Sequence, residues 1–425
     1  MRRSENKWKS LFLLMALVVF LCGCSLIPEP IVDPEEGLRA LQREYIPVND
    51  EENSHTWEGK KPGDVGTEIS PTEETSSESL TEEAVEDGSL AEDPVEAELD
   101  TFPADADGIV RITICGAGDV TLGMTHQQDY SYSFDQMYDT CQDPGYFFAN
   151  VADYFANDDC TIVNLEGPLT STTEMLEEKE FIIKGKPEYV HILSAGSVEM
   201  AGFSNNHRLD YGQAGFNETL SLLEQENIPC AVDDKYALFE TAKGIKVGLV
   251  AVHTTCLSDY ANGFVKKGIA SLREQGADLV VINIHWGIER NNYPEDYQRT
   301  MGKNCIDWGA DLVLGSHPHV LQGVEVYKNR CIIYSLANFC FGGNRNPVDK
   351  DTMIFKQTFE FKDGQLLDTL RAQVIPCSVT SDSSRNNYQP TPSEGAQYTR
   401  ILNRIKEFST GFGTEIDEDG SIIVG

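Results

Sequence analysis

Short apolar runs rich in β-branched residues recur through the second part of the chain, and most end at a glycine, asparagine or histidine. Runs of this length predict strands, several of them buried on both faces. Amphipathic stretches with helical period separate them. The predicted strands are residues 111–116, 161–165, 198–203, 246–252, 279–284 and 312–314, and the predicted helices are residues 147–157, 215–225 and 295–308. Strands that alternate with helices predict an α/β fold with a largely parallel sheet.

Hairpins replace this alternation toward the end of the chain. Two are predicted, at residues 323–334 with a turn at Lys328-Asn329, and at residues 353–361 and 366–374 with a turn at Asp363-Gly364. A helical pattern over residues 395–408 and a weak acidic tail follow. We therefore expect the domain that begins with residues 108–350 to be completed by the hairpin, helix and tail of residues 351–425.

The start of the chain has the pattern of a targeting segment. Basic residues precede an unbroken apolar run over residues 11–21, which is too short to span a bilayer comfortably, so residues 1–24 are predicted to be a signal peptide. The run ends in Leu21-Cys22-Gly23-Cys24, which resembles the lipobox of bacterial lipoproteins. This resemblance implies lipidation of Cys24 and a membrane anchor outside the cytoplasm. The alternative is an ordinary signal peptide with an incidental cysteine.

Residues 25–107 have a composition that does not support a packed core. They contain 25 acidic residues and 4 lysines and arginines, a net charge of 4 − 25 = −21, with few aromatic or branched apolar side chains. Such a segment buries too little apolar surface to offset the entropy lost on folding. We expect a disordered acidic linker that extends by self-repulsion, although a binding role for this run stays open.

Charge and cysteine content limit the possible partners and cross-links. The whole chain carries a formal charge of −36, which argues against nucleic acid as a partner because phosphate binding needs clustered lysine and arginine. An anionic substrate or polymer remains compatible with a metal site, where the ions dominate the local field. Nine cysteines remain beyond Cys22 and Cys24, and most are expected to be buried thiols, with disulfides left open.

Polar residues follow five of the predicted strands at their carboxyl ends, where open α/β sheets bind ligands. The segments are Gly118-Asp119, residues 164–168, residues 204–212, His285-Trp286-Gly287 and residues 315–319. Each residue alone has an ordinary structural explanation, such as a turn cap or a core histidine. Together they supply carboxylates, amides and imidazoles from five strand ends. This combination predicts a site for divalent ions such as Mn²⁺, Fe²⁺ or Zn²⁺.

The same residues belong to motifs that resemble those of a known family. GDVTLG, NLEGPLT, NNHRLDYG, HWGIE, GSHPHVLQG and YSLANF resemble, in order and approximate spacing, the motifs of the CapA family of capsule, or poly-γ-glutamate, biosynthesis proteins. The resemblance covers roughly residues 112–342. That family is similar in turn to the calcineurin-like metallophosphoesterases. The resemblance therefore implies a four-layer α/β/β/α sandwich around a site for two metal ions.

The resemblance also implies a role for individual residues. The implied metal ligands are Asp119 for one ion, Glu166 as the bridging carboxylate, Asn206 and His285 for the second ion, and His317 and His319 split between the ions. His207 would not ligate but would act as the general acid for the leaving group. Trp286, Asn338 and Phe339 lie in adjoining motifs and either shape a substrate pocket or simply pack.

Two positions depart from the pattern. Thr121 stands where the superfamily has a histidine, and Ala337 stands where many related sequences have glycine. His126 is a possible substitute for the missing histidine. These departures leave open whether the site holds one ion or two.

The implied biological role is that of a surface-anchored component of capsule or poly-γ-glutamate assembly, working with a membrane synthase complex. Two rival functions remain. One is a metal-dependent phosphoesterase that hydrolyses a nucleotide or a cell-wall phosphate. The other is a non-catalytic scaffold within the synthase complex. The ligand set predicts metal binding and leaves turnover open.

Overall fold

A computed structural model describes residues 105–176 and 179–423 of the chain. The predicted signal peptide, Cys24 and nearly all of the predicted acidic linker lie outside the described residues. Within the described ranges, no helix has both the length and the apolar character needed to cross a membrane. Every cysteine in these ranges is a free thiol, and all are buried except Cys141 and Cys256.

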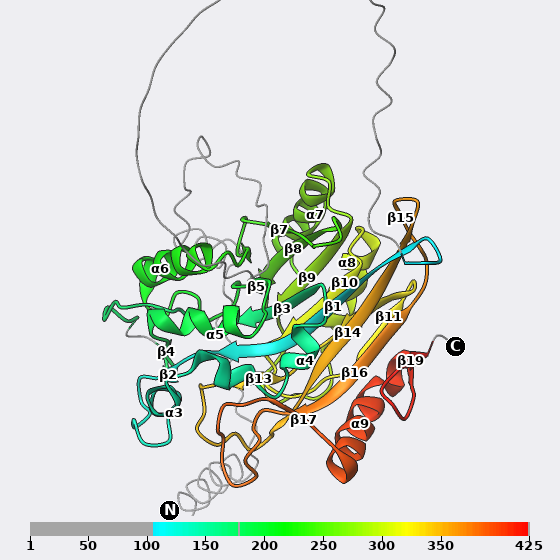
Figure 1. The fold of residues 1–425 in the computed structure, drawn as a ribbon. Coiled ribbons are helices and arrows are strands. Elements are labelled where there is room, and N and C mark those ends of the chain that lie inside the picture. Colours follow the sequence, from blue (N-terminus) through cyan, green and yellow to red (C-terminus); the bar gives the residue numbers. More distant parts are fainter. Residues whose placement is uncertain (1–104, 177–178, 424–425) are drawn as a thin grey trace, which may run out of the picture. The chain divides into compact units, whose positions relative to one another are not determined.

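Two β-sheets form the centre of the described structure (Figure 1). The first sheet has the strand order β17 (Thr391–Pro392), β16 (Arg371–Ser378), β14 (Asp351–Lys362), β1 (Ile109–Thr121), β3 (Cys160–Leu165), β5 (Met200–Gly202) and β6 (Cys230–Ala231), with β13 (Asn338–Phe341) beside β1 and β15 (Gln365–Leu366) beside β14. The second has the order β11 (Val324–Tyr327), β12 (Arg330–Ile333), β10 (Leu312–Ser316), β9 (Leu279–His285), β8 (Lys246–His253) and β7 (Ala237–Glu240).

Parallel and antiparallel pairing are combined in both sheets. Strands β1, β3, β5 and β6 are parallel, as are β8, β9, β10 and β12, and the predicted α/β class is confirmed. Strand β14 pairs antiparallel with β1 over a continuous register from Ile109↔Lys362 to Gly116↔Phe355. The chain after residue 350 therefore extends the same sheet that the first strand begins. Two small ladders complete the strands: β2 (Met124–Thr125) with β4 (Ile183–Lys184), and β18 (Glu415–Ile416) with β19 (Ile422–Ile423).

A continuous apolar core fills the space between the sheets. Ile114 of the first sheet and Leu249 and Leu314 of the second belong to it, and all three are buried. The sheets approach closely near the carboxyl ends of their strands, where a Cβ at Gly202 would lie only 2.1 Å from Asn283 Oδ1. Burial of this much apolar surface is the main stabilising contribution of the inter-sheet layer.

Helices cover both outer faces of the sheets. They are α3 (Phe134–Cys141), α4 (Ala152–Phe155), α5 (Val190–Ala195), α6 (Gly212–Gln225), α7 (Asp259–Glu274), α8 (Asp296–Asp307) and α9 (Gly395–Ser409), with 3₁₀ turns η1 (Pro144–Phe148), η2 (Pro187–Tyr189) and η3 (Thr410–Phe412). Helices α3 to α6 pack on the first sheet, and α7 and α8 pack on the second. Helix α9 contributes Ile405 to the inter-sheet core and packs on both β16 and β11.

Most predicted elements are present, and the differences have local causes. The predicted helix over residues 147–157 is divided into η1 and α4, with Asn150 between them bonded to Gln389 and Thr391. The predicted strand over residues 366–374 is divided into β15 and β16. Helix α8 matches its prediction within one residue at each end, and a capping box between Glu295 and Gln298 begins it.

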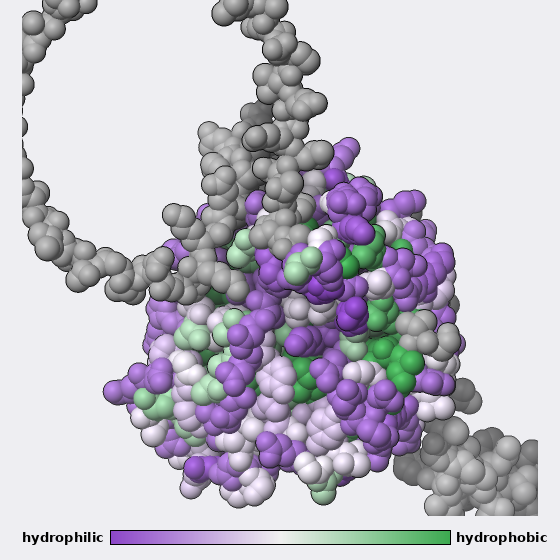
Figure 2. All heavy atoms as spheres, turned by 45° about the vertical axis from the view of Figure 1, so that its right-hand side comes forward, coloured by the Kyte–Doolittle hydropathy of each residue, from purple (hydrophilic) through white to green (hydrophobic). Residues whose placement is uncertain are grey.

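Both predicted turns have the backbone geometry that the hairpins need. Lys328 and Asn329 have φ of 50° and 59°, and Asp363 and Gly364 have φ of 51° and 71°. Two consecutive positive φ values match the twist of antiparallel strands. On the face drawn in Figure 2, hydrophilic residues predominate and apolar side chains are exposed in small groups.

Candidate metal centre

The predicted ligands come from strand ends of both sheets. Asp119 is near the end of β1, and Glu166 directly follows β3. His285 ends β9, whereas His317 follows β10 directly. Because the carboxyl ends of parallel strands lie at one edge of a sheet, the facing edges of the two sheets bring these side chains together.

The distances show how closely the side chains approach. His319 lies at the centre, with Nδ1 3.2 Å from Asp119 Oδ2 and Nε2 3.7 Å from Glu166 Oε1. His285 Nε2 is also 3.7 Å from Glu166 Oε1, and it lies 2.8 Å from Asn206 Oδ1. The rings of His285 and His317 are 4.6 Å apart between centroids. The structure thus brings all six predicted ligands into one cluster.

Two buried polar atoms of this cluster fit a bound cation. Glu166 is 1% exposed, and its Oε1 atom has no hydrogen-bond partner among the described residues. The buried Nδ1 atom of His317 likewise has no partner within the described ranges. A buried polar atom without a partner is unfavourable unless an ion or water satisfies it. The ligating atoms of Asp119, Glu166 and His319 all lie within 4.8 Å of one another, so the residues present fit a divalent ion.

Neighbouring side chains orient the predicted ligands. Asn164 donates a hydrogen bond to Asp119 Oδ1 at 2.8 Å, and Thr121 donates one to Glu166 Oε2 at 3.0 Å. Thr121, at the position of the superfamily's histidine, therefore holds the buried carboxylate in place. Asn338 Oδ1 lies 2.8 Å from His319 Nδ1, so this predicted pocket residue contacts a predicted ligand. Such outer contacts fix ring orientation and tune ligand basicity.

The backbone at the end of β10 is unusual. His317 and His319 both have positive φ, of 96° and 57°, a region that non-glycine residues seldom occupy. The N–H of His317 donates to Asp119 Oδ2 at 3.3 Å. Ala337 also has positive φ, 64°, which explains why glycine suits this position. Strained backbone of this kind clusters at functional sites.

Burial and mutual charge shift the pKa values of the cluster. Burial raises the pKa of Glu166 to about 7, and the charge of Asp119 adds to the shift. Burial holds the pKa of His285 well below its usual range, and it also lowers the pKa of His317. Burial opposes protonation of His319, but the negative charges of Glu166 and Asp119 outweigh it and raise its pKa to about 10. Neutral His285 and His317 are in the state that binds metal.

His207 lies beside the cluster and contacts a different partner. Its Nδ1 atom is 2.6 Å from Asp210 Oδ2. The Asp210 carboxylate is fully buried, accepts the N–H of Ile183 at 2.8 Å and pairs with Lys179 at 2.7 Å. A carboxylate that anchors one imidazole nitrogen leaves the other available for proton transfer.

The side chains of Trp286 and Phe339 pack in the apolar core, and His126 is at the surface. Trp286 is fully buried in the core beneath α8, where its Nε1 donates to the carbonyl of Tyr334 at 2.8 Å. Phe339 packs against Phe148 on the outer face of the first sheet. Both side chains therefore pack in the core and do not line a pocket at the cluster. His126 is exposed, unlike the buried Asp119 and Glu166.

Sequence reasoning missed two residues at the centre. His253 ends β8 opposite His285, with ring centroids 5.6 Å apart, and burial lowers its pKa to about 3. Its position at the end of a predicted strand was the available signal. Glu289 ends the HWGIE motif, and its carboxylate lies within 4.8 Å of the ring nitrogens of His317 and His319.

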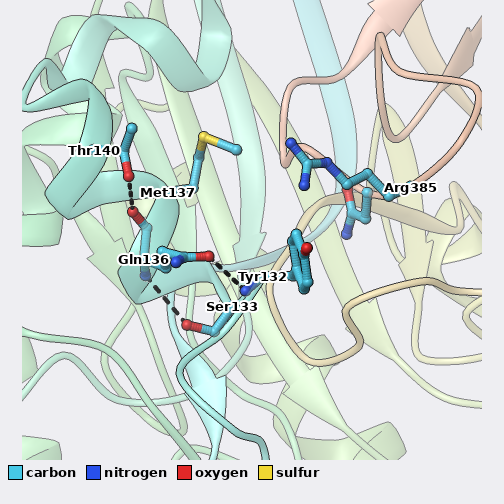
Figure 3. A pocket seen from close by; sticks show the side chains of 7 residues that line it. Tyr132, Ser133, Gln136, Met137, Thr140 and Arg385 are labelled. Atoms are coloured by element: carbon cyan, nitrogen blue, oxygen red, sulfur yellow. Dashed lines mark hydrogen bonds between the residues drawn. The ribbon is translucent and has the colours of Figure 1, made fainter.

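A separate pocket of about 280 Å³ lies between α3 and the loop at Arg385 (Figure 3). Tyr132, Gln136 and Met137 line it, and the Arg385 guanidinium lies 5.0 Å from the centre of the Tyr132 ring. None of the predicted ligands lines this pocket, so it is distinct from the metal cluster.

The sequence matches a protein family across this domain. Residues 113–343, more than half of the 425-residue chain, match the family described as "Bacterial capsule synthesis protein PGA_cap". The chain belongs to this family of bacterial capsule synthesis proteins.

Relatives come from several bacteria. The chain is 27% identical over 312 residues to the capsule biosynthesis protein CapA of Bacillus anthracis, covering 65% of this chain and 71% of that protein. It is 33% identical over 214 residues to the PGA biosynthesis protein CapA of Bacillus subtilis, covering 46% of this chain and 56% of that protein. A probable polyglutamine synthesis accessory protein of Mycobacterium tuberculosis is 22% identical over 291 residues, covering 61% of this chain and 74% of that protein.

Proposed function

We propose that this chain is a surface-anchored component of capsule or poly-γ-glutamate biosynthesis whose folded domain binds divalent metal ions. Family membership and the names of the Bacillus relatives support the biosynthetic role. One observation carries the metal site: Asp119, Glu166 and His319 present ligating atoms within 4.8 Å of one another, and Glu166 Oε1 is buried without a hydrogen-bond partner among the described residues. Two sheets with helices on their outer faces are compatible with the four-layer sandwich of metallophosphoesterases.

The chemistry of this proposal is metal-assisted hydrolysis. Bound divalent ions would lower the pKa of a water molecule and stabilise negative charge on a phosphoryl or acyl oxygen. Asp119, Glu166, Asn206, His285, His317 and His319 would hold the ions. His207 gives a proton to the leaving group, and Asp210 keeps its ring in position.

A metal-dependent phosphoesterase that acts on a nucleotide or cell-wall phosphate is the second candidate. The pairing of His207 with the buried Asp210 favours it, because a scaffold has no need of an oriented proton donor. A non-catalytic scaffold of a membrane synthase complex instead predicts that capsule survives loss of the His207 side chain.

The anchoring part of the proposal depends on residues outside the described ranges. Lipidated Cys24 would attach the chain to the membrane, and the acidic linker would hold the domain away from the anionic surface. A synthase complex in the membrane is the proposed partner.

Two measurements test this proposal on the same variants. The purified chain, loaded with Mn²⁺, Fe²⁺ or Zn²⁺, is assayed on generic phosphomonoester and phosphodiester probes, and capsule is quantified in cells that carry each variant. Metal-dependent turnover together with capsule loss in His207→Ala supports a catalytic role. Capsule that is unaffected by His207→Ala contradicts it and favours the scaffold.

A further inference from the structure

The carboxylate of Glu289 lies beside the predicted metal ligands without belonging to the set that the sequence motifs imply. We propose that Glu289 is a metal ligand, which binds an ion together with His317 and His319. This inference rests on the proposed metal site and adds one ligand to it. An added ligand matters because Thr121 stands where the superfamily has a histidine ligand. Thr121 donates a hydrogen bond to Glu166 and offers no imidazole to an ion.

The spacing of the three side chains suits one ion. The ligating atoms of Glu289, His317 and His319 all lie within 4.8 Å of one another. The ligating atoms of Asp119, Glu166 and His319 are equally close together. Ligands that bind an ion at about 2.0–2.2 Å stand roughly 3–4 Å from one another. Small rotations of the side chains are therefore enough to close either group around an ion. The two groups share His319, so they describe neighbouring positions in one centre.

The backbone fixes Glu289 beside the two histidines. The segment that follows β9 runs next to the segment that follows β10, because Ser316 and His285 are paired in register. The N–H of Trp286 donates to the carbonyl of Ser316 at 3.1 Å, and the N–H of Arg290 donates to the carbonyl of Pro318 at 2.8 Å. These hydrogen bonds lie on both sides of Glu289 in the sequence. The main chain therefore holds residue 289 beside the segment that carries both histidines, within reach of its carboxylate.

The histidine that faces Glu289 has an unused nitrogen. The Nδ1 atom of His317 is buried and has no hydrogen-bond partner within the described ranges. Glu166, which is 1% exposed, has an unpartnered oxygen in the same cluster, 3.7 Å from His319 Nε2. Both atoms are ligand types for divalent ions. They point to a cation independently of the exposed Glu289.

Charge balance also favours a third carboxylate if the site holds two ions. Asp119 and Glu166 supply two negative charges, and the other four predicted ligands are neutral when they bind metal. Two divalent ions held by these residues would leave an excess of two positive charges. Glu289 halves that excess and still leaves the centre attractive to an anionic group.

The test compares Glu289→Gln with Glu274→Gln. Both changes remove one exposed glutamate charge. Glu274 ends α7, which leads into the amino end of β9, so it lies at the opposite edge of the sheet from the centre. Mn²⁺ binding to the full chain is measured by titration calorimetry and by elemental analysis after dialysis. Changes to residues that only support ligands weaken metal binding about 10–100-fold, so Glu289→Gln should weaken one binding event at least tenfold. Glu274→Gln should bind as the unmodified chain does.

A second variant separates ligation from folding or substrate contact. Glu289→Cys places a soft thiolate at this position, which should shift metal preference from Mn²⁺ toward Cd²⁺. Ligation predicts a thiolate-to-cadmium absorption band in Glu289→Cys that exceeds any band given by free thiols such as Cys256 in the unmodified chain. The circular dichroism spectrum of each variant checks that the fold is retained.

The outcomes distinguish this inference from the proposed function. If the unmodified chain binds Mn²⁺ and Glu289→Gln binds it with equal stoichiometry and affinity, Glu289 is not a ligand, although the metal site stands. Loss of turnover with unchanged metal binding likewise overturns the inference and assigns Glu289 to the substrate. If the unmodified chain binds no divalent ion, the proposed function and the inference fail together.

Discussion

The Nδ1 atom of His207 lies 2.6 Å from Oδ2 of Asp210, a carboxylate that is fully buried beside the predicted metal centre. Asp210 is held in turn by the N–H of Ile183 and by Lys179. The imidazole therefore has one anchored nitrogen. The proposed role of His207 as proton donor is separate from metal binding, so the two proposed roles can be tested separately.

Replacement of His207 by alanine should abolish turnover without removing metal. General acid catalysis contributes roughly 10²–10⁴-fold, so the rate on a phosphoester probe should fall by about that factor. Metal content, measured on the same preparation, should equal that of the unmodified chain. His191→Ala is the matched control, because the side chain of His191 is 53% exposed on α5 and pairs with Glu226. A His207→Ala chain with normal activity contradicts the assigned role.

Metal affinity should fall as the pH falls, and most steeply below about 7. Burial raises the pKa of Glu166 to about 7, so in the metal-free protein this carboxyl becomes protonated as the pH drops through that value. An ion binds only the carboxylate of Glu166 and only the neutral ring of His319, whose pKa is about 10, so binding near neutral pH should release protons from both groups. Calorimetric titration in two buffers of different ionisation enthalpy measures that release. Affinity that is constant between pH 5 and 8 would argue against Glu166 as a ligand.

Gly118 and Ala337 should respond in opposite ways to substitution. A Cβ at Gly118 would lie 1.9 Å from the carbonyl oxygen of Ala337, which also accepts the N–H of Asp119. Gly118→Ala should therefore cost about 3 kcal/mol or more of unfolding free energy and weaken metal binding.

Ala337→Gly is the contrasting change. Ala337 has a φ of 64°, and left-handed backbone costs a non-glycine residue about 1–2 kcal/mol. Glycine removes that strain but loses about 0.5–1 kcal/mol through its greater freedom when unfolded. The unfolding free energy, measured by chemical denaturation, should stay unchanged or rise by up to about 1.5 kcal/mol. A destabilised Ala337→Gly chain would show that the methyl group contributes to packing.

Membrane attachment should depend on Cys24. The Cys24→Ser chain cannot be acylated, so it should appear in the soluble fraction or accumulate with its leader uncut. Fractionation followed by immunoblotting measures both results. Cys22→Ser is the control, because it changes the neighbouring cysteine and keeps the lipidation site. Full membrane retention of a correctly cut Cys24→Ser chain shows that the lipobox assignment is wrong.

Strands β8 and β9 of the second sheet were predictable because they are buried on both faces and form continuous apolar runs. Residues 246–252 correspond to β8, Lys246–His253, and residues 279–284 correspond to β9, Leu279–His285. Helix α7 was missed, because Gly263 and Gly268 lower its helix propensity. Gly268 is needed there, since a Cβ would lie 2.7 Å from the ring of Tyr236. This close approach to Tyr236 exists only in the folded structure, so the sequence alone does not show why the helix contains a glycine here.

The predicted metal centre, like the fold, could be derived from the sequence only in part. Strand ends marked Asp119 and His285 as candidates, because polar residues directly after buried strands are conspicuous. Asp210 and Glu289 lie in loops, and their roles depend on how those loops pack. The hydrogen bond from the N–H of Arg290 to the carbonyl of Pro318 holds the main chain near Glu289 beside the segment that follows β10. No local sequence pattern shows that these two segments are neighbours.

Elemental analysis of the purified chain is the most direct test of the central claim, that the strand ends of the two sheets hold divalent metal ions. The unmodified chain and His317→Ala are equilibrated with Mn²⁺, Fe²⁺ or Zn²⁺, dialysed and analysed for bound metal. The structure predicts one or two tightly bound ions in the unmodified chain and a clear loss in His317→Ala. An unmodified chain that retains no more metal than His317→Ala would contradict the account.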